Sequence, residues 1–231
     1  MLTGAGMSAE SGVPTFRDAQ TGLWAQYDPA ELATPQAWVR DPELVWGWYQ
    51  WRRRLVTDCV PNPGHQALAK WAEHTELRIV TQNVDDLHER AGSPVLAHLH
   101  GSLFEFRCDA CARPVPAPPL PTTPDPDARV EPPNCPDCVG RIRPGVVWFG
   151  ESLPTDQFNA GVDAVLASDL VLAVGTSGIV QPAALLPDMA RRAGIPVAEL
   201  NLERTPLTDR TTIAWQVPAG VGLPALLASL E

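Results

Sequence analysis

Residues 78–101 read RIVTQNVDDLHERAGSPVLAHLHG, and this stretch decides the fold. Its apolar start predicts a strand that runs into a polar tip, after which a short helix and a second strand lead to His100. The tip contains Gln82, Asn83 and Asp85. In a parallel sheet both strands end at the same edge, where open α/β sheets bind their ligands. The tip and His100 are therefore expected to be neighbours in a polar reaction centre. The alternative, a polar turn and a histidine satisfied in the core, stays open from these residues alone.

The rest of the chain alternates helices with strands. Hydrophobic periodicity and capping residues predict helices that begin at Asp41 and that cover 65–76, 155–167, 181–193 and 223–230, with strands over 170–174, 197–200 and 212–217. Such alternation is typical of a doubly wound, Rossmann-like parallel sheet. Polar or glycine-rich tips follow four strands, at 4–6, 82–85, 175–177 and 201–203. Four such tips favour one shared nucleotide site over four unrelated turns.

The composition restricts the class of protein. The chain has 231 residues, which suits one large domain or one with a small insertion. Its net charge of −10 argues against binding to nucleic acid or to acidic membrane surfaces, although a basic protein remains an acceptable partner. No apolar run approaches the about 20 residues that cross a membrane, and the start lacks the pattern of a signal peptide. We expect a cytoplasmic monomer without membrane contacts.

Four of the five cysteines form two C-x-x-C pairs, Cys108 with Cys111 and Cys135 with Cys138. Two such pairs at this separation offer four thiolates for tetrahedral zinc, at about 2.3 Å each. Because four sulfurs leave no coordination position open, the metal is expected to be structural. The pairs also indicate a reducing compartment, where cysteines hold metal rather than form disulfides. The proline-rich stretch between the pairs predicts a loop.

The predicted helix after Asp41 carries a basic residue in an apolar row. Tyr49 and Arg52 share one helix face with two valines, so Arg52 interrupts a hydrophobic stripe one turn from a tyrosine hydroxyl. Two interpretations stay open. Either the arginine stem packs while its head reaches water, or the guanidinium and the hydroxyl form a donor site for a planar anion.

Near the start of the chain, Gly4 and Gly6 follow a very short apolar stretch. Glycines at a strand-to-helix turn let the backbone approach a phosphate, which the helix N-terminus then stabilises. An ordinary glycine turn fits the spacing as well. Among the histidines, His65 and His74 are expected at the surface or as capping residues, and His88 in a structural role.

Together these motifs resemble the sirtuin family of NAD-dependent protein-lysine deacylases. The matching stretches follow the family order over nearly the whole chain: GAGMSAESGVPTFR (4–17), TQNVD (81–85), HLHG (98–101), the four cysteines, RPGVVWFGE (143–151), GTS (175–177) and NLE (201–203). Ala33-Thr-Pro with Tyr49-x-x-Arg52 resembles the branch that removes succinyl and malonyl groups. The resemblance implies a Rossmann-like lobe (about 1–25, 63–103 and 144–231), a helical lid (about 26–62) and a zinc-binding insertion (about 104–143).

The resemblance also implies a reaction. NAD is cleaved to nicotinamide, the acyl group passes from a substrate lysine of a protein to the ribose, and free lysine and O-acyl-ADP-ribose are released. His100 would act as general base on a ribose hydroxyl, while Asn83 and Asp85 would orient the ribose and stabilise charge on it. The acyl-lysine segment would lie as a strand beside residues 147–151.

The family pattern assigns two further sets of residues. The cofactor NAD would contact Gly4, Ala5, Gly6, Ser8, Thr15, Phe16, Arg17, Trp24, Gln82, Asn83, Asp85, Gly175, Thr176, Ser177, Asn201, Leu202, Glu203 and Ala219. The acylated lysine of the substrate would contact Ala33, Tyr49, Arg52, Val147, Phe149, Gly150 and Glu151.

Two departures from the family pattern concern the start of the chain and His98. Only Met1 and Leu2 precede the Thr-Gly-Ala-Gly turn, so the first strand is expected to be unusually short, or the natural start to lie upstream. His98 stands two residues before His100, and strand alternation would put both imidazoles on one face. His100 is preferred as the base because Gly101 follows it, as in the family.

Three other functions compete with deacylation. A mono-ADP-ribosyltransferase would share the cleavage of nicotinamide but leave ADP-ribose on a protein. A dehydrogenase would use the same nucleotide fold for hydride transfer. A zinc-ribbon module would bind nucleic acid, which the acidic balance and the lack of a basic stripe near the cysteines disfavour.

Overall fold

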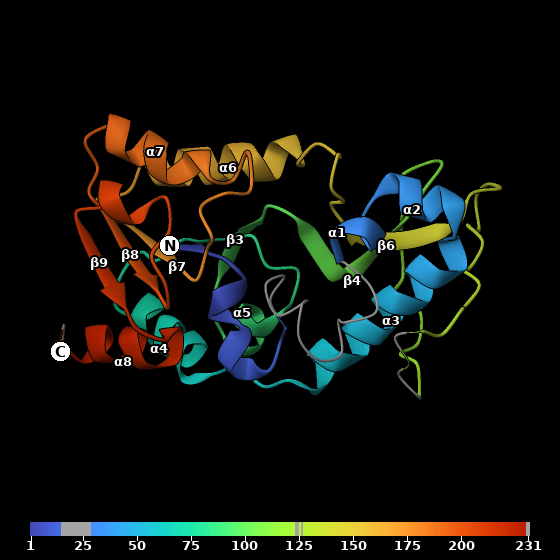
Figure 1. Cartoon of the computed structure of the whole chain (residues 1–231), viewed down its shortest axis with the longest axis horizontal. Coiled ribbons are helices and arrows are strands. Elements are labelled where there is room, and N and C mark those ends of the chain that lie inside the picture. The colour runs from blue at the N-terminus through green and yellow to red at the C-terminus, as the bar shows by residue number, and fades with distance from the viewer. Residues whose placement is uncertain (15–28, 123–124, 126, 230–231) are drawn as a thin grey trace. The chain divides into compact units, whose positions relative to one another are not determined.

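A computed structural model describes residues 1–14, 29–122, 125 and 127–229. The chain forms two compact units (Figure 1). The first, here called the sheet unit, comprises Met1–Thr15, Val60–Leu99 and Leu153–Glu231. The second, here called the cysteine unit, comprises Phe16–Cys59 and His100–Ser152.

The sheet unit holds a six-stranded sheet in which every pairing is parallel. The strands lie in the order β3-β2-β1-β7-β8-β9. Their bounds are β1 Leu2–Thr3, β2 Ile79–Thr81, β3 Val95–His98, β7 Val171–Val174, β8 Val197–Asn201 and β9 Ile213–Gln216. The chain builds from β1 outward to β3 and then returns to the other side of β1 with β7. The strand order therefore reverses between β1 and β7, and open α/β sheets bind ligands at the carboxyl ends of strands at such a point.

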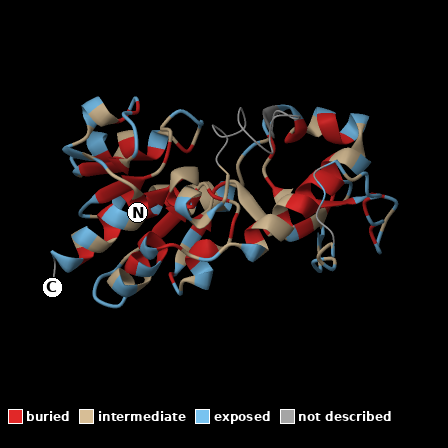
Figure 2. Cartoon of the chain, turned by 60° about the horizontal axis from the view of Figure 1, so that its bottom comes forward, coloured by how far each residue is buried: buried red, intermediate tan, exposed pale blue. Residues whose placement is uncertain are grey.

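Helices cover both faces of this sheet. α6 (Thr155–Leu166) and α7 (Leu185–Arg192) lie on one face, and α4 (Pro63–Ala72) and α8 (Ala219–Ala228) on the other (Figure 1). A separate hydrophobic cluster fills each face (Figure 2). The inner strands β2, β1, β7 and β8 are buried between them, whereas the edge strands β3 and β9 are more exposed. The predicted doubly wound parallel sheet is confirmed. Short elements complete the unit: α5 (Leu87–Arg90), η1 (Ala5–Met7), η2 (Ala9–Ser11) and η5 (Thr208–Arg210).

The cysteine unit combines helices with a small antiparallel sheet. Its helices are α1 (Pro29–Leu32), α2 (Pro35–Arg40) and α3 (Pro42–Asp58), and its strands, in the order β5-β4-β6, are β4 (Gly101–Cys108), β5 (Pro114–Val115) and β6 (Ile142–Val146). Asp41 caps α3 as predicted, because its carboxylate accepts a hydrogen bond from the Leu44 amide at 3.2 Å. Trp46 of α3 packs its ring edge against Phe106 of β4, with centroids 5.7 Å apart. None of the helices in the described parts of the chain has the length and apolar character needed to cross a membrane.

The last helix begins earlier than its sequence indicates. It starts at Ala219 rather than at the predicted residue 223. The amide of Gly220, which has no partner within the helix, donates to the Glu10 carboxylate at 2.7 Å. A negative charge at a helix N-terminus is also stabilising. The start of the helix is thus fixed by a side chain from the other end of the sequence.

His65 is fully buried, so the expectation of a surface position is wrong. It lies in the first turn of α4, next to Gly64, whose backbone comes close to that of Ala219 at the start of α8. Its ring stands 4.9 Å from that of His88, which is buried in the structural role expected for it. Burial lowers the pKa of His65 to about 4 and that of His88 to about 3, so both rings are neutral near pH 7.

Candidate functional site

Two backbone turns meet at the reversal point of the sheet. The amide of Gly4 donates to the Val174 carbonyl at 3.0 Å, and the amide of Gly6 donates to the Gly175 carbonyl at 2.8 Å. A Cβ on Gly4 would lie 2.8 Å from the Cα of Thr176, and one on Gly6 would lie 2.8 Å from the Cα of Gly175. These glycines are therefore required for contact between the two turns. The helix expected after them is not an α-helix, because residues 5–7 and 9–11 form single 3₁₀ turns.

Side chains from the predicted tips join across this point. The Gln82 amide donates to the Thr176 hydroxyl at 2.8 Å, and the Asn201 amide donates to the Thr176 carbonyl at 2.8 Å. The Asn83 amide donates to the Ser8 hydroxyl at 3.1 Å. The tips after β1, β2, β7 and β8 are thus brought together, as the sequence predicts for a shared site.

Asp85 is a buried carboxyl group in the same tip. Its pKa is raised to about 6, because burial disfavours the charged form more than hydrogen bonds from the Leu87 amide and the Ser8 hydroxyl favour it. A carboxyl group whose pKa is shifted in this way by its surroundings is characteristic of functional sites.

The two histidines at the end of β3 have different surroundings. The strand ends at His98, and the amide of Leu99 donates to the Thr81 carbonyl at 2.8 Å. Residues 99 and 100 form a turn, so the extended alternation that would align both imidazoles does not continue. Within the cysteine unit, the half-buried His100 accepts a hydrogen bond from the Val147 amide at its carbonyl, at 2.8 Å.

The remaining predicted cofactor residues fall into three groups. Ala5 and Ser177 are half-buried and Ala219 is buried at the start of α8. Leu202 and Glu203 are exposed after β8. The others lie outside the described residues: Thr15, Phe16, Arg17 and Trp24.

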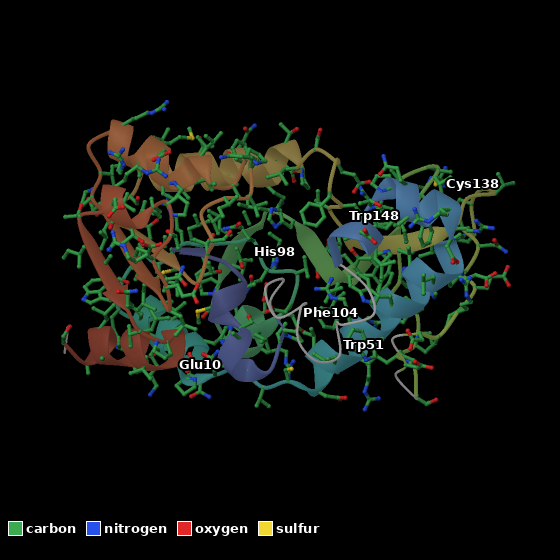
Figure 3. The ribbon with its side chains drawn as sticks, viewed as in Figure 1. Glu10, Trp51, His98, Phe104, Cys138 and Trp148 are labelled. Carbon is green, nitrogen blue, oxygen red and sulfur yellow. The ribbon has the colours of Figure 1, made fainter. Side chains whose placement is uncertain are left out.

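The four paired cysteines come together in the cysteine unit. The sulfurs of Cys108, Cys111, Cys135 and Cys138 all lie within 4.8 Å of one another (Cys138 is labelled in Figure 3). Four ligands at about 2.3 Å from a tetrahedral zinc stand about 3.8 Å apart. The observed separations of 3.4 Å for Cys108–Cys138 and 3.9 Å for Cys111–Cys135 fit this geometry. Backbone amides of residues 110, 111, 137 and 140 point at these sulfurs, as expected for thiolates that bind a metal.

The predicted substrate residues also gather within the cysteine unit. The Phe149 amide donates to the Ala33 carbonyl at 2.9 Å, which joins the loop after β6 to the segment between α1 and α2. Tyr49 of α3 is buried, and its hydroxyl oxygen accepts a hydrogen bond from the Trp148 indole at 3.0 Å. The Arg52 guanidinium lies over the ring of Trp48 at 4.8 Å and over that of Tyr49 at 5.7 Å.

An ion pair that the sequence does not reveal holds this loop. Arg143 donates to both oxygens of Glu151, at 2.6 and 2.9 Å, and its guanidinium lies 3.3 Å from the centre of the Trp148 ring. Glu151 also accepts from the Trp148 amide at 2.9 Å. The Glu151 carboxylate, which is already paired with Arg143, therefore stabilises the conformation of the loop that contains Val147, Phe149 and Gly150.

Comparison with known proteins gives concordant results. Residues 4–182 match the family model described as the Sir2 family. The NAD-dependent protein deacylase Sir2 of Mycolicibacterium smegmatis is 55% identical over 230 residues, which cover 100% of this chain and 95% of that protein. The NAD-dependent protein deacylase of Mycobacterium tuberculosis H37Rv is 55% identical over 100% of this chain and 96% of its own length.

Solved structures agree with the sequence relatives. A complex of a Sir2 homolog with NAD superposes with a TM-score of 0.89 at 44% identity, covering 99% of this chain and 87% of that chain. A Sir2 protein bound to an acetylated peptide superposes with a TM-score of 0.82 at 29% identity, covering 99% of this chain and 91% of that chain.

Zinc content tests the cysteine cluster. Purified protein is expected to hold one zinc per chain by elemental analysis, and Cys135→Ser to lose it. Structural zinc contributes on the order of 10–16 kcal/mol in small zinc peptides, so chelation is expected to unfold at least the cysteine unit. Cys59→Ser is the matched control, because Cys59 lies outside the cluster and donates to the Leu55 carbonyl. Zinc-free protein with an intact cysteine unit would contradict the assignment.

Asp85→Asn is expected to stabilise the fold. The folded state holds the Asp85 proton more tightly than the unfolded state, because burial raises the pKa of this carboxyl group to about 6. The free energy of unfolding therefore decreases as the pH rises from about 4 to about 6 and the folded protein is forced to ionise Asp85. A difference of about two units between the pKa values of the folded and unfolded states corresponds to about 3 kcal/mol. Urea titrations should show a gain of that order at pH 7.5 and little gain at pH 4, whereas Asp58→Asn, at an exposed carboxylate paired with Arg54, should show no gain. Equal stability of Asp85→Asn and unmodified protein at pH 7.5 would show that the buried carboxylate carries no such cost.

Proposed function

The chain belongs to the Sir2 family, and we propose that it is an NAD-dependent protein-lysine deacylase that prefers succinyl- and malonyl-lysine to acetyl-lysine. The activity is carried by 55% identity, over the whole chain, to two proteins named as NAD-dependent protein deacylases. The acyl preference is supported by the Trp148–Tyr49 hydrogen bond, which leaves the phenol proton for donation, and by the Arg52 guanidinium, which lies over the Tyr49 ring.

NAD would bind at the joined tips of the sheet unit. The residues that meet there offer backbone amides, hydroxyls and amide side chains, the groups that hold phosphates and riboses in nucleotide folds. When bound, NAD supplies a ribose carbon that becomes electrophilic as nicotinamide leaves. Asn83 is held at its backbone amide by Thr81 and at its side chain by Ser8, so its carboxamide is fixed where the tips meet. Asp85 would favour positive charge on the ribose when ionised, above about pH 6.

His100 would remove the proton from a ribose hydroxyl. Imidazole accepts protons near neutral pH, which suits a general base. His100 comes two residues after β3, which pairs with β2, the strand that leads to Asn83. Its carbonyl accepts a hydrogen bond from the amide of Val147, in the loop assigned to the substrate. Zinc would hold the ends of β4 and β6 together and take no part in the chemistry, because all four positions are filled by sulfur.

Tyr49 and Arg52 would bind the carboxylate of an acidic acyl group. Because the Trp148 indole donates to the Tyr49 oxygen, the phenol proton is the group that Tyr49 can donate. Burial raises the pKa of Tyr49 to about 12, so that proton is retained at all physiological pH values. Arg52 lies over the Tyr49 ring and adds donors in a planar fork. Ala33, tied to Phe149, would leave room for the longer acyl chain.

The proposed substrates are acylated lysines of proteins, bound as an extended segment beside residues 147–151. The net charge of −10 favours basic targets. The paired cysteines support a reducing, cytoplasmic setting, and we retain a monomer as the working oligomeric state. Mono-ADP-ribosyl transfer is the alternative, because it needs the same cleavage of NAD.

Product analysis tests the activity. Incubation with NAD and a succinyl-lysine peptide is expected to give nicotinamide, free lysine peptide and O-succinyl-ADP-ribose by mass spectrometry. His100→Ala is expected to lower turnover by about 10²–10⁴-fold while keeping its zinc and its melting temperature. His74→Ala, an exposed histidine, is the control. ADP-ribose attached to protein, with the acyl group left on lysine, would favour the transferase instead.

The acyl preference is tested by Arg52→Met. A charge-assisted hydrogen bond contributes about 1.5–3 kcal/mol, or roughly 10–100-fold in affinity. We expect kcat/KM for a succinyl-lysine peptide to fall by that factor and kcat/KM for an acetyl-lysine peptide to be unchanged or higher. Arg54→Met, on the same helix but paired with Asp58, should change neither. Full desuccinylase activity in Arg52→Met, or equal losses on both substrates, would refute the anion site.

A further inference from the structure

His98 is held at both of its ring nitrogens. Nε2 lies 2.6 Å from a carboxylate oxygen of Glu89, and Nδ1 lies 3.2 Å from the backbone carbonyl of Asn83. The backbone amide of His98 donates to the Gln157 side chain at 3.0 Å, which fixes the end of β3 against α6. Figure 3 labels His98 at this end of the strand. The ring therefore forms a bridge between α5 and the tip that carries Asn83.

Both oxygens in this bridge can only accept hydrogen bonds. A carbonyl has no proton, and a carboxylate has none at neutral pH, whereas a neutral imidazole has only one N–H. Two such contacts can both be hydrogen bonds only if both nitrogens carry protons. We propose that His98 is a positioning residue, an imidazolium that is anchored by Glu89 and that holds the Asn83 backbone in place for the cleavage of NAD. This inference rests on the proposed function, because it takes Asn83 as a residue of the reaction centre.

The surrounding charges favour the protonated ring. Burial alone would lower the pKa of His98, but the hydrogen bond and charge of Glu89, the Asn83 carbonyl and the nearby Asp85 raise it above its ordinary value. A positive charge on the neighbouring His88 would oppose this shift. That ring stays neutral, because burial lowers its pKa to about 3. The pKa of Glu89 is lowered in turn: burial opposes this shift, and the His98 hydrogen bond and charge outweigh it.

The bridge completes the support of Asn83. Thr81 accepts from its backbone amide at 3.0 Å, Ser8 accepts from its side chain at 3.1 Å, and His98 donates to its carbonyl. Loss of the His98 proton removes one of the two ring hydrogen bonds. The proton that remains is drawn to the charged Glu89, so the contact to Asn83 is the one that is lost. A ring that is already protonated also cannot act as the base, which leaves that role to His100.

This role predicts a pH effect that a packing role would not produce. As pH rises through the pKa of His98, Asn83 loses its third contact, and kcat for nicotinamide release should fall while KM for NAD changes less. In Glu89→Gln the neutral amide no longer stabilises the imidazolium, so this alkaline decline should move to lower pH. In His98→Gln the decline should disappear. Its kcat should be roughly tenfold lower than that of the unmodified enzyme at pH values below the decline, since small displacements of reacting groups lower rates by such factors, and the two enzymes should have similar kcat above it. Glu73→Gln, at an exposed carboxylate that directly follows α4, is the matched control and should keep the profile of the unmodified enzyme.

The protonation state can be read directly by ¹⁵N–¹H NMR of the histidine rings in the zinc-loaded protein. The proposed bridge predicts two protonated ring nitrogens on His98 at pH 7 and a lower titration midpoint in Glu89→Gln. A single N–H on His98 at pH 7, or an alkaline decline that Glu89→Gln leaves in place, would overturn it. If the unmodified protein releases no nicotinamide from NAD in the presence of acyl-lysine peptides, the proposed function fails instead. The NMR titration then still decides whether His98 is the cationic bridge.

Discussion

Two glycine turns that touch without side chains between them set the geometry of the sheet unit. Gly6 approaches Gly175 so closely that a methyl group on either would displace the backbone of the other. This contact lies at the reversal point of the strand order, and it brings the ends of β1 and β7 together. Gln82 and Asn201 then reach Thr176 from both sides. The proposed nucleotide site, which is built from the ends of four strands, would depend on this close approach.

Polar groups around that contact are arranged at a cost to stability. Asp85 is a buried carboxyl group, and the buried, neutral rings of His65 and His88 lie in the same unit. A core of apolar residues would avoid the cost of removing these ionisable groups from water. Such costs are typical of sites where charge and proton transfer are used. The proposed roles of Asn83, Asp85 and His98 would explain why buried polar groups are retained here. Each would help to stabilise, directly or through Asn83, the charge that the ribose carries during cleavage.

The sequence predicted what depends on short spacings. Strand 78–81 with its tip, the Asp41 cap and the two C-x-x-C pairs all have local patterns, and the structure bears them out. The sequence did not predict contacts between residues that lie far apart in the chain. Glu10 sets the start of α8, and Trp148 orients Tyr49, across separations of 210 and 99 residues. The sequence suggests a surface or capping position for His65, whereas its ring is buried beside that of His88. Strand alternation alone would place His98 and His100 on one face, but β3 ends at His98 and a turn follows.

A crystal structure of the protein with NAD tests most directly whether the joined tips hold the reacting ribose. The oxygens of the nicotinamide ribose should then lie within hydrogen-bond distance of the Asn83 carboxamide and the Asp85 carboxylate. The Asn83 carbonyl should still accept from His98. A ribose bound away from Asn83 and Asp85, with the tips contacting only the adenine half or no part of NAD, would contradict the proposed site.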